Sequence, residues 1–403
     1  MRRRVLILVE NLPSPFDRRV WQEATALRDA GYAVSIICPT GRGCEKRFEE
    51  LEGIHIWRYR LPVEASGALG YLLEYSAALA WTFFLSLRVL AKRGFDVIHA
   101  CNPPDLFFLV GGFYKLFGKR FVFDHHDANP ELYEAKFGRR GFLWKVMVWL
   151  EKLTFRTADV SIATNESYRR IAIERGGMAP ERVFVVRSGP SLDRMRILPP
   201  DENLKRGRKY LVGYVGVMGR QEGIDYLLRA AAHIVHDLGR RDVHFGLVGG
   251  GTSLEEMRSL AARLGIGQHV TFTGRVPDAE MLAMLNTADV CVNPDVANPM
   301  NDISTMNKVM EYMALGKPMV QFDLAEGRFS AQEASLYARR NDALDLAEKI
   351  VHLLDHPEKR KAMGEFGRRR VLEELEWRHE APKLLAAYEA LWAQGAPRPR
   401  HAT

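Results

Sequence analysis

The stretch NPDVANPMNDISTMNKVMEYMALGKPMVQFDLAEGRF, residues 293–329, decides the fold. It starts at the end of an apolar run, crosses a polar loop and enters a helical pattern. It then turns at Gly316-Lys317-Pro318 into a second apolar run. Strand, helix and strand in this order are the unit from which α/β folds with parallel sheets are built.

The helix in this stretch carries Lys308 and Glu311, which lie three residues apart and therefore on one face. Asp302, Ser304 and Thr305 precede it, where we expect capping residues. A helix N-terminus, a cation and a carboxylate together suit a sugar nucleotide, because they can hold a diphosphate and ribose hydroxyls. The alternative is a surface ion pair on an ordinary capped helix, which is a frequent arrangement.

Apolar runs alternate with helical patterns along the whole chain, and many of the runs are continuous, as in parallel strands covered on both faces. The predicted strands span residues 5–9, 33–38, 55–59, 97–100, 121–124, 160–164 and 183–187, then 211–215, 244–248, 270–273, 290–293, 319–322 and 335–338. Two such series predict an α/β protein with two doubly wound, Rossmann-like domains.

The domain boundaries follow from a polar segment, LPPDENLKRGRK at residues 198–209, which has the composition of a linker. We therefore predict a first domain over residues 1–205 and a second over residues 206–376. A helical pattern at residues 377–395 is expected to cross back to the first domain.

Composition limits the function classes. The chain has 403 residues, a net charge of +7 and four scattered cysteines without a C-x-x-C pair. The charge favours anionic partners, and the cysteines indicate neither a disulfide framework nor a zinc site, which fits a reduced cytoplasmic compartment. With no D-x-D motif we expect no metal and no cofactor. Walker A and G-x-S-x-G motifs are also absent.

Two glycine-rich turns follow predicted strands. Gly250 is the middle of three glycines after residues 244–248, with Ser253 placed to cap the next helix. Gly219 ends the segment GYVGVMG, and Arg220 follows it. Such turns can bring backbone N–H groups to a phosphate, which Arg220 can also bind. Tight structural turns and an exposed arginine are equally compatible with these residues.

A third candidate region is the segment FDHHDANPE, where His126 and Asp127 stand just past a predicted strand. Ligands of open α/β sheets bind outside the carboxyl ends of the strands, so His126 can orient groups or relay protons there. His125 is expected to point the opposite way. Asn102 lies in a loop after another strand. The alternative for His126 is a structural loop histidine.

Two segments have the composition of membrane-surface helices. Residues 70–92 are rich in Leu, Trp and Phe, and residues 136–152 combine basic and aromatic side chains. The longest apolar run, residues 77–87, is too short to cross a bilayer, so we expect no membrane-spanning helix. Core helices with a solvated basic face are the alternative.

Together these features resemble the GT-B glycosyltransferases of family 4, which are retaining enzymes that use nucleotide sugars. The likeness rests on EYMALGKPMV at residues 311–320, on GRVPDAEMLAMLNTADVCVNP at residues 274–294, and on HDANP at residues 126–130. It implies a donor site formed by Gly219, Arg220, Gly250, Val276, Ser304, Thr305, Lys308 and Glu311. It also implies catalytic roles for His126 and Asp127, and acceptor contacts from Arg18 and Asn102.

The chain departs from the family pattern in its N-terminal loop, NLPSPFDRR at residues 11–19, where paired glycines are usual and where Arg18 or Arg19 can contribute. It also departs at three single positions. Ile303 stands where the first glutamate of an E-x7-E pair is usual, and Val217 and Glu222 stand where Arg and Lys are usual. These departures resemble a branch that acts in bacterial surface-polysaccharide assembly.

The resemblance implies transfer of a hexosyl unit, from a UDP-sugar in the first place, to a saccharide or lipid-linked acceptor. We expect a peripheral protein on the cytoplasmic face of the inner membrane, with no nucleic-acid partner. Two alternatives stay open: a nucleotide-sugar epimerase of the same architecture, and a non-catalytic sugar- or nucleotide-binding protein.

Overall fold

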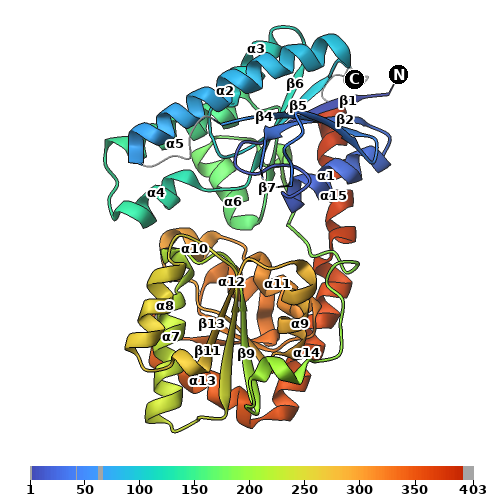
Figure 1. Ribbon diagram of the computed structural model, residues 1–403. Coiled ribbons are helices and arrows are strands. Elements are labelled where there is room, and N and C mark those ends of the chain that lie inside the picture. The colour runs from blue at the N-terminus through green and yellow to red at the C-terminus, as the bar shows by residue number, and fades with distance from the viewer. Residues whose placement is uncertain (1, 42, 62–66, 394–403) are drawn as a thin grey trace, which may run out of the picture. The chain divides into compact units, whose positions relative to one another are not determined.

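The computed structural model describes residues 2–41, 43–61 and 67–393, and within these the chain forms two compact units. Unit 1 comprises Met1–Ser188 and Glu380–Thr403, and unit 2 comprises Gly189–His379 (Figure 1). Unit 1 is therefore built from two separate parts of the sequence. Residues 394 and 395 of the predicted crossing helix lie outside the described residues.

The sheet of unit 1 has eight strands in the order β3-β4-β2-β1-β5-β6-β7-β8. Their bounds are β1 Arg4–Leu8, β2 Ala33–Pro39, β3 Phe48–Leu51, β4 Ile54–Tyr59, β5 Val97–Cys101, β6 Arg120–His125, β7 Val160–Ala163 and β8 Val183–Val185. All seven predicted strands are confirmed. The strand that the sequence did not predict, β3, pairs antiparallel with β4 at the sheet edge.

The helices of unit 1 are α1 Arg18–Asp29, α2 Gly67–Lys92, α3 Phe108–Lys115, α4 Asn129–Phe137, α5 Phe142–Thr157, α6 Glu166–Arg170 and the larger part of α15 Trp377–Ala393. Local sequence sets the ends of α1. The side chain of Asp17 accepts a hydrogen bond from the N–H of Val20, and Gly31 follows the helix with φ +90°. An L side chain rarely adopts that backbone conformation, so the glycine ends the helix.

The sheet of unit 2 has six strands, all parallel, in the order β11-β10-β9-β12-β13-β14. The strands are β9 Tyr210–Val215, β10 Val243–Val248, β11 Val270–Gly274, β12 Val290–Asn293, β13 Met319–Phe322 and β14 Ser335–Ala338. The helices are α7 Ile224–Ala232, α8 Leu254–Arg263, α9 Asp278–Thr287, α10 Pro299–Ile303, α11 Asn307–Ala314, α12 Ala325–Ala331, α13 Ala343–Asp355 and α14 Pro357–Arg370. The strand order reverses between β9 and β12, where such sheets bind ligands.

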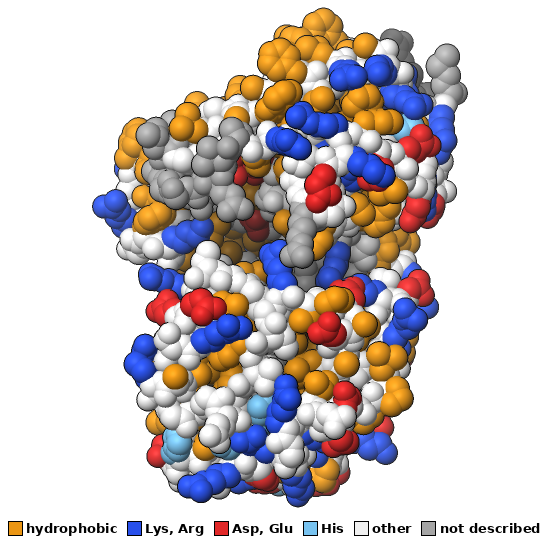
Figure 2. Space-filling model, in the orientation of Figure 1, with side chains coloured by type: hydrophobic (Ala, Val, Ile, Leu, Met, Phe, Trp, Pro, Cys, Tyr) orange, Lys and Arg blue, Asp and Glu red, His pale blue; other side chains and the backbone are white. Residues whose placement is uncertain are grey.

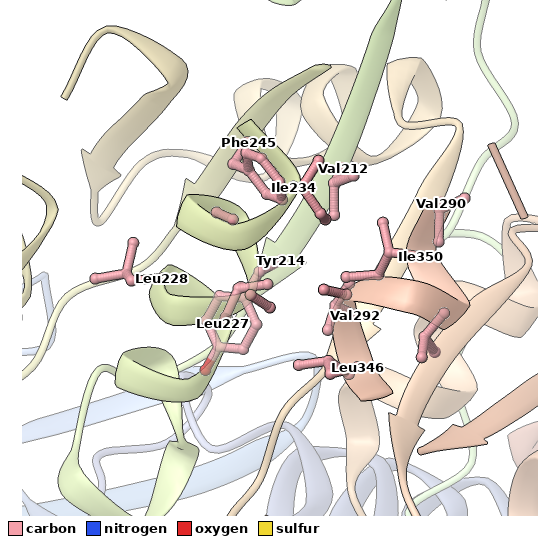
Figure 3. Close-up of a cluster of buried hydrophobic side chains, with 14 of the residues drawn as sticks. Val212, Tyr214, Leu227, Leu228, Ile234, Phe245, Val290, Val292, Leu346 and Ile350 are labelled. Carbon is pink, nitrogen blue, oxygen red and sulfur yellow. The ribbon is translucent and has the colours of Figure 1, made fainter. Parts of the chain in front are cut away.

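One face of the unit 2 sheet is sealed by apolar side chains from strands and helices (Figure 3). Val212 and Tyr214 of β9 meet Leu227 of α7 and Ile350 of α13 in this cluster, and all four are buried. Burying a side chain of this size contributes about 1.5–3 kcal/mol. The cluster therefore holds β9, and with it the turn that follows β9, in a fixed place.

The prediction that Asp302, Ser304 and Thr305 cap the Lys308 helix is wrong. Asp302 lies inside α10, Ser304 and Thr305 lie in the next loop, and the N-cap of α11 is Met306, which makes no side-chain cap. Asp302 instead accepts hydrogen bonds from the N–H of Ala325 and from Arg340. Asp302 therefore bonds to a distant backbone N–H and to a cation instead of to the N-terminus of α11.

The polar segment at residues 198–209 is not a free linker, because it lies on α9 of unit 2. The N–H of Leu198 donates to Asn286 Oδ1 at 2.9 Å, and the N–H of Asp201 donates to Thr287 Oγ1 at 2.8 Å. Composition alone does not show these contacts, since both partners lie more than eighty residues further along the chain. The structure accordingly divides the chain after Ser188.

Helix α2 is longer than the apolar run from which the sequence analysis judged it. Over Leu73–Lys92 it is long and apolar enough to cross a membrane by length and composition, and 22% of that stretch is buried. Core helices of soluble proteins pass the same test, so the finding alone does not establish a span.

Candidate active site

Lys308 is the centre of a buried ionic cluster in unit 2. Its Nζ donates to Glu222 Oε2 at 2.7 Å and to Asp295 Oδ1 at 2.8 Å, and it lies 5.1 Å from the centre of the Tyr214 ring. Glu222 belongs to the turn after β9, Asp295 follows β12, and Lys308 is in the first turn of α11. The cluster therefore stands at the strand-order reversal, and it includes the helix on which the sequence analysis expected a donor site.

The cluster holds one ammonium between two carboxylates. Burial acts to lower the pKa of Lys308, but Asp295, Tyr214 and Glu222 outweigh it and raise that pKa well above its ordinary value. Burial raises the pKa of Asp295 to about 7. Lys308 is thus firmly charged, and in this structure its charge is directed at protein carboxylates. The sequence analysis noted Glu222 as a departure but did not foresee this pairing.

Glu311, on the same helix as Lys308, is bound by an arginine that the sequence analysis did not predict. Glu311 Oε1 accepts from Arg194 Nη1 at 2.7 Å, and Arg194 also donates to both carboxylate oxygens of Asp278. Arg194 lies in a loop 117 residues before Glu311, and no local motif marks it. The pairing fixes Glu311 on the α11 surface.

The glycine turns after β9 and β10 pack backbone against backbone. A Cβ atom at Gly249, which has φ +132°, would lie 1.8 Å from the carbonyl oxygen of Gly216. The N–H of Met218 donates to the carbonyl of Gly250 at 3.0 Å. The predicted Gly250 is the less constrained glycine, because its Cβ would make only an ordinary contact with Arg275. Steric contact with backbone reserves Gly249 and Gly251 for glycine, since a Cβ at Gly251 would lie 2.5 Å from the carbonyl oxygen of Met218.

The other predicted donor residues have varied surroundings. Gly219 precedes the turn that contains Arg220, and the Arg220 side chain is exposed. Val276 is partly buried against the hydrophobic core, and Ser304 Oγ donates to the carbonyl of Met300 at 2.7 Å. Thr305 is partly buried in the loop before α11. Ser253 is the N-cap residue of α8 as predicted, but its side chain makes no cap hydrogen bond.

In unit 1, His126 is held at the end of β6 by a loop from β5. Asn102 Oδ1 accepts from the N–H of His126 at 2.7 Å and from the N–H of Asp127 at 3.1 Å. The Asn102 amide also donates to Asp105 and to the carbonyl of Asp127. Asn102, predicted as an acceptor ligand, therefore also clamps the His126 loop.

The imidazole of His126 contacts two charged side chains. Its Nε2 is hydrogen-bonded to Asp124, and Arg19 Nε lies 3.0 Å from the same nitrogen. Arg19 donates from Nη2 to Asp124 Oδ1 at 2.8 Å and lies 3.0 Å from Glu23 Oε1. Arg19, Glu23 and Asp124 are buried. Arg18, predicted to contact the acceptor, is exposed, and its neighbour Arg19 reaches His126.

Further buried groups extend this network. His99 Nδ1 and the Tyr388 hydroxyl are 2.8 Å apart, and His99 Nε2 lies 3.4 Å from Asp124 Oδ2. Burial opposes the charge of Asp124, but Arg19 and His126 outweigh it and hold the pKa of Asp124 well below its usual range. Burial raises the pKa of Glu23. Asp124 therefore carries the negative charge that Arg19 and His126 face.

Four side chains in this region are of types that can bind a metal ion, although the sequence indicated no metal site. Ligand atoms of Glu23, His99, Cys101 and Asp124 all lie within 4.8 Å of one another. The Arg19 guanidinium contacts both carboxylates and already supplies a positive charge there. We therefore describe the group as an arginine-centred charge network.

The two neighbours of His126 in this segment, His125 and Asp127, have different surroundings. Burial raises the pKa of Asp127, the predicted partner of His126. His125 is fully buried against the rings of Phe123, Phe155 and Tyr168, and burial lowers its pKa to about 3. The prediction that His125 and His126 face opposite ways is confirmed.

Comparison with known proteins agrees with this architecture. Residues 17–189 match the family described as "Glycosyl transferase 4-like domain", and residues 209–356 match "Glycosyl transferases group 1". The chain is 27% identical over 307 residues to alpha-maltose-1-phosphate synthase of Mycolicibacterium smegmatis, covering 69% of this chain and 75% of that protein. It is 27% identical over 349 residues to 2-deoxystreptamine glucosyltransferase of Streptomyces kanamyceticus, covering 83% and 88%.

Among solved structures, sucrose-phosphate synthase from Thermosynechococcus elongatus superimposes with a TM-score of 0.79 and 20% sequence identity. The alignment covers 98% of this chain and 100% of that one. The predicted fold of two Rossmann-like domains is thereby confirmed. The first domain matches the glycosyl transferase 4-like family and the second matches glycosyl transferases group 1, so the chain is a glycosyltransferase of the GT-B fold.

Proposed function

We propose that this glycosyltransferase is a retaining, family 4 hexosyltransferase that uses a nucleoside-diphosphate sugar, with UDP as the first choice of nucleotide. The observation that carries the proposal is the position of Lys308 and Glu311. Both lie on α11, and Lys308 joins the loops that follow β9 and β12 at the strand-order reversal. A charged ammonium at that point suits a diphosphate.

The chemistry assigned to this site is stabilisation of a leaving diphosphate. Breaking the sugar–phosphate bond places negative charge on the departing oxygens, and a preorganised cation stabilises that charge as it develops. Lys308 supplies one such cation, and the exposed Arg220 in the turn after β9 supplies a second. The proposal needs no metal ion, since two cationic side chains and backbone N–H groups provide the positive charge.

Glu222 sets a condition on this chemistry. Its carboxylate lies 2.7 Å from Lys308 Nζ and is less buried than that of Asp295. A diphosphate that approaches Lys308 meets this like charge, so we propose that Glu222 yields its contact to the donor. Lys308 then exchanges one anionic partner for another and remains paired throughout.

In unit 1 we assign His126 and Asp127 to the reacting groups. The Asp124 carboxylate and the Arg19 guanidinium orient the His126 ring, and Asn102 fixes the backbone of the same loop. The proposed acceptor is a saccharide or a lipid-linked saccharide. We further propose surface-polysaccharide synthesis at the cytoplasmic face of the inner membrane, which the exposed apolar and basic side chains of α2 and α5 support.

The experiment is a screen of the purified chain with UDP-hexoses and GDP-hexoses. A donor that binds the folded state raises its melting temperature, so a thermal shift selects the nucleotide. Nuclear magnetic resonance of the product with each acceptor then gives the anomeric configuration. A product with inverted configuration contradicts the retaining assignment, and a shift with GDP-sugars alone contradicts UDP.

The same screen separates the proposal from the two alternatives of the sequence analysis. An epimerase converts the donor without any acceptor, and a non-catalytic binding protein shifts in melting temperature without product. The family matches favour transfer, so a new glycosidic bond is the expected result.

A further inference from the structure

Three rows of side chains run along α2 and differ in their exposure. Ala78, Thr82, Ser86 and Val89 face the core and are buried. A second row, Leu73, Ala80, Phe84 and Leu87, faces away from the core, and its residues recur at steps of seven, four and three. Leu73 and Phe84 are 63% and 64% exposed. The second row is therefore an apolar stripe on the outside of unit 1.

The third row of α2 borders the stripe and faces the β3–β4 hairpin. Trp81, Leu85 and Arg88 line a pocket of about 310 Å³ together with Arg47, Phe48, Trp57, Arg58 and Tyr59 of the hairpin. The Arg88 guanidinium lies 5.5 Å and the Lys92 ammonium 5.7 Å from the centre of the Trp57 ring. Phe48 packs on the same ring at 4.6 Å. Aromatic walls and cationic groups thus meet in one pocket.

The arginines of this pocket differ in how their charge is matched. Arg58 is buried and donates to Glu49 Oε2 at 3.0 Å and to the carbonyl of Ser14 at 2.7 Å. Arg47 and Arg88 are exposed, and within the described residues no carboxylate lines the pocket beside them. Their positive charge is therefore directed at the pocket and at solvent. A pocket of this kind attracts an anion.

We propose that this pocket binds the phosphate of an anionic phospholipid headgroup while the apolar stripe of α2 enters the same lipid layer. Arginine binds phosphate through paired N–H donors, and tryptophan is favoured at the boundary between water and hydrocarbon. Trp81, 41% exposed, lies at this boundary between the stripe and the pocket. In Figure 2, hydrophobic and Lys or Arg side chains lie side by side over the part of unit 1 that holds α2.

A bilayer accounts for both features at once, whereas a soluble anion accounts only for the pocket. Residues Leu73–Lys92 of α2 have the length and composition of a membrane helix, and the same helix lines the pocket with Trp81, Leu85 and Arg88. A helix that lies in the headgroup layer buries its apolar side in lipid and keeps basic side chains near the phosphates. This inference rests on the proposed membrane-surface location, but not on the donor chemistry.

The test compares the full chain with R47Q/R88Q, using sedimentation with vesicles of phosphatidylcholine alone and of phosphatidylcholine with phosphatidylglycerol. The matched control is R241Q/R263Q, which removes the same charge from exposed arginines of unit 2. Two contacts of this kind are expected to change binding to anionic vesicles by at least about tenfold. The R47Q/R88Q variant should lose that binding and the control should keep it. Thermal unfolding of each variant verifies the fold.

Several results would overturn the inference. Equal losses of vesicle binding in both double variants would show general charge attraction. If the wild type bound neutral vesicles as well as anionic ones, an anionic headgroup would not be the ligand. Glycerol phosphate that binds as tightly as the vesicles would make the ligand a soluble anion. A change in the oligomeric state of R47Q/R88Q without lipid would make the face an interface between copies. Sugar transfer to a soluble acceptor should be unchanged in R47Q/R88Q, so failure of the donor proposal is seen separately.

Discussion

The two units each place a buried cation between two carboxylates, and they use different cations. In unit 1 the buried Arg19 contacts Glu23 and Asp124, and it also donates to the carbonyl of Val186. In unit 2 the cation is Lys308, between Glu222 and Asp295. A guanidinium has a rigid fork of donors, whereas an ammonium on a flexible stem can change partners.

The difference indicates a fixed site in unit 1 and an adaptable one in unit 2. Arg19 binds a carboxylate, a backbone carbonyl and His126 at once, so moving it would break several bonds together. Lys308 can give up Glu222 for an incoming anion and keep Asp295. Four predictions test the two units.

Removing the cation of unit 1 should have the largest effect. In Arg19→Met, Asp124 and Glu23 lose their buried partner, and breaking a buried pair costs about 3–5 kcal/mol of unfolding free energy. Denaturant unfolding monitored in unit 1 measures the loss. The matched control is Arg18→Met, because Arg18 is the exposed neighbour on the same helix. Arg18→Met should change stability by less than about 0.5 kcal/mol, and equal effects in the two variants would contradict the fixed network.

Removing the cation of unit 2 should act on turnover. Lys308→Ala deletes a charge that stabilises the leaving diphosphate, so kcat should fall by at least about tenfold. Lys308→Arg retains the charge and serves as the control, with a smaller loss expected. Initial rates at saturating donor distinguish the two variants. Full turnover in Lys308→Ala would contradict the donor assignment.

Low pH should reduce the unfolding free energy of unit 1, because His125 is buried in its interior. Burial holds the pKa of His125 at about 3 in the folded protein, while a histidine in the unfolded chain titrates near about 6.5. The unfolded state therefore binds the proton first, and stability falls as the pH drops from about 6.5 towards 3, by up to about 1.4 kcal/mol per pH unit.

His125→Phe should reduce this pH dependence, because a phenyl ring suits the surrounding Phe123, Phe155 and Tyr168 and carries no titrating group. The measurement is the unfolding free energy of both proteins as a function of pH. An unchanged slope below pH 6.5 in the variant would show that other groups bind the protons.

The smallest expected effect is an increase in donor affinity. Glu222→Gln removes the carboxylate that competes with a diphosphate for Lys308 and keeps the side-chain shape. We expect donor Kd to fall by about threefold, the size of a modest charge interaction in a partly exposed site. Isothermal titration with the donor measures it, and Glu255→Gln on the exposed start of α8 is the control. Weaker binding in Glu222→Gln would show that Glu222 is itself a donor ligand.

The sequence was sufficient for the strands because parallel strands are buried on both faces and appear as continuous apolar runs. Strand β3, with the sequence FEEL, has no buried residue, and it escaped prediction for that reason. Local rules also failed at α11, where Asp302 bonded to Ala325 instead of capping the helix.

The residues proposed for the candidate site were selected from motif and position. Lys308 lies at a helix start, His126 lies just past a strand end, and Glu311 lies on the same helix as Lys308. Arg19 and Arg194 were missed as partners, since Arg19 lies 105 residues from Asp124 and Arg194 lies 117 residues from Glu311. Contacts at such separations leave no periodic or spacing signal, and only the folded chain brings them together.

The hydrogen bond between His99 and Tyr388 spans 289 residues, and this separation has a consequence for synthesis on the ribosome. All of Gly189–His379 is translated before Tyr388 exists, so unit 2 has its complete sequence while unit 1 still lacks its last helix. Domains fold as units during translation. Unit 1 of this enzyme therefore starts to fold first and is completed last, because the hydrogen bond of His99 forms only after Tyr388 has been translated.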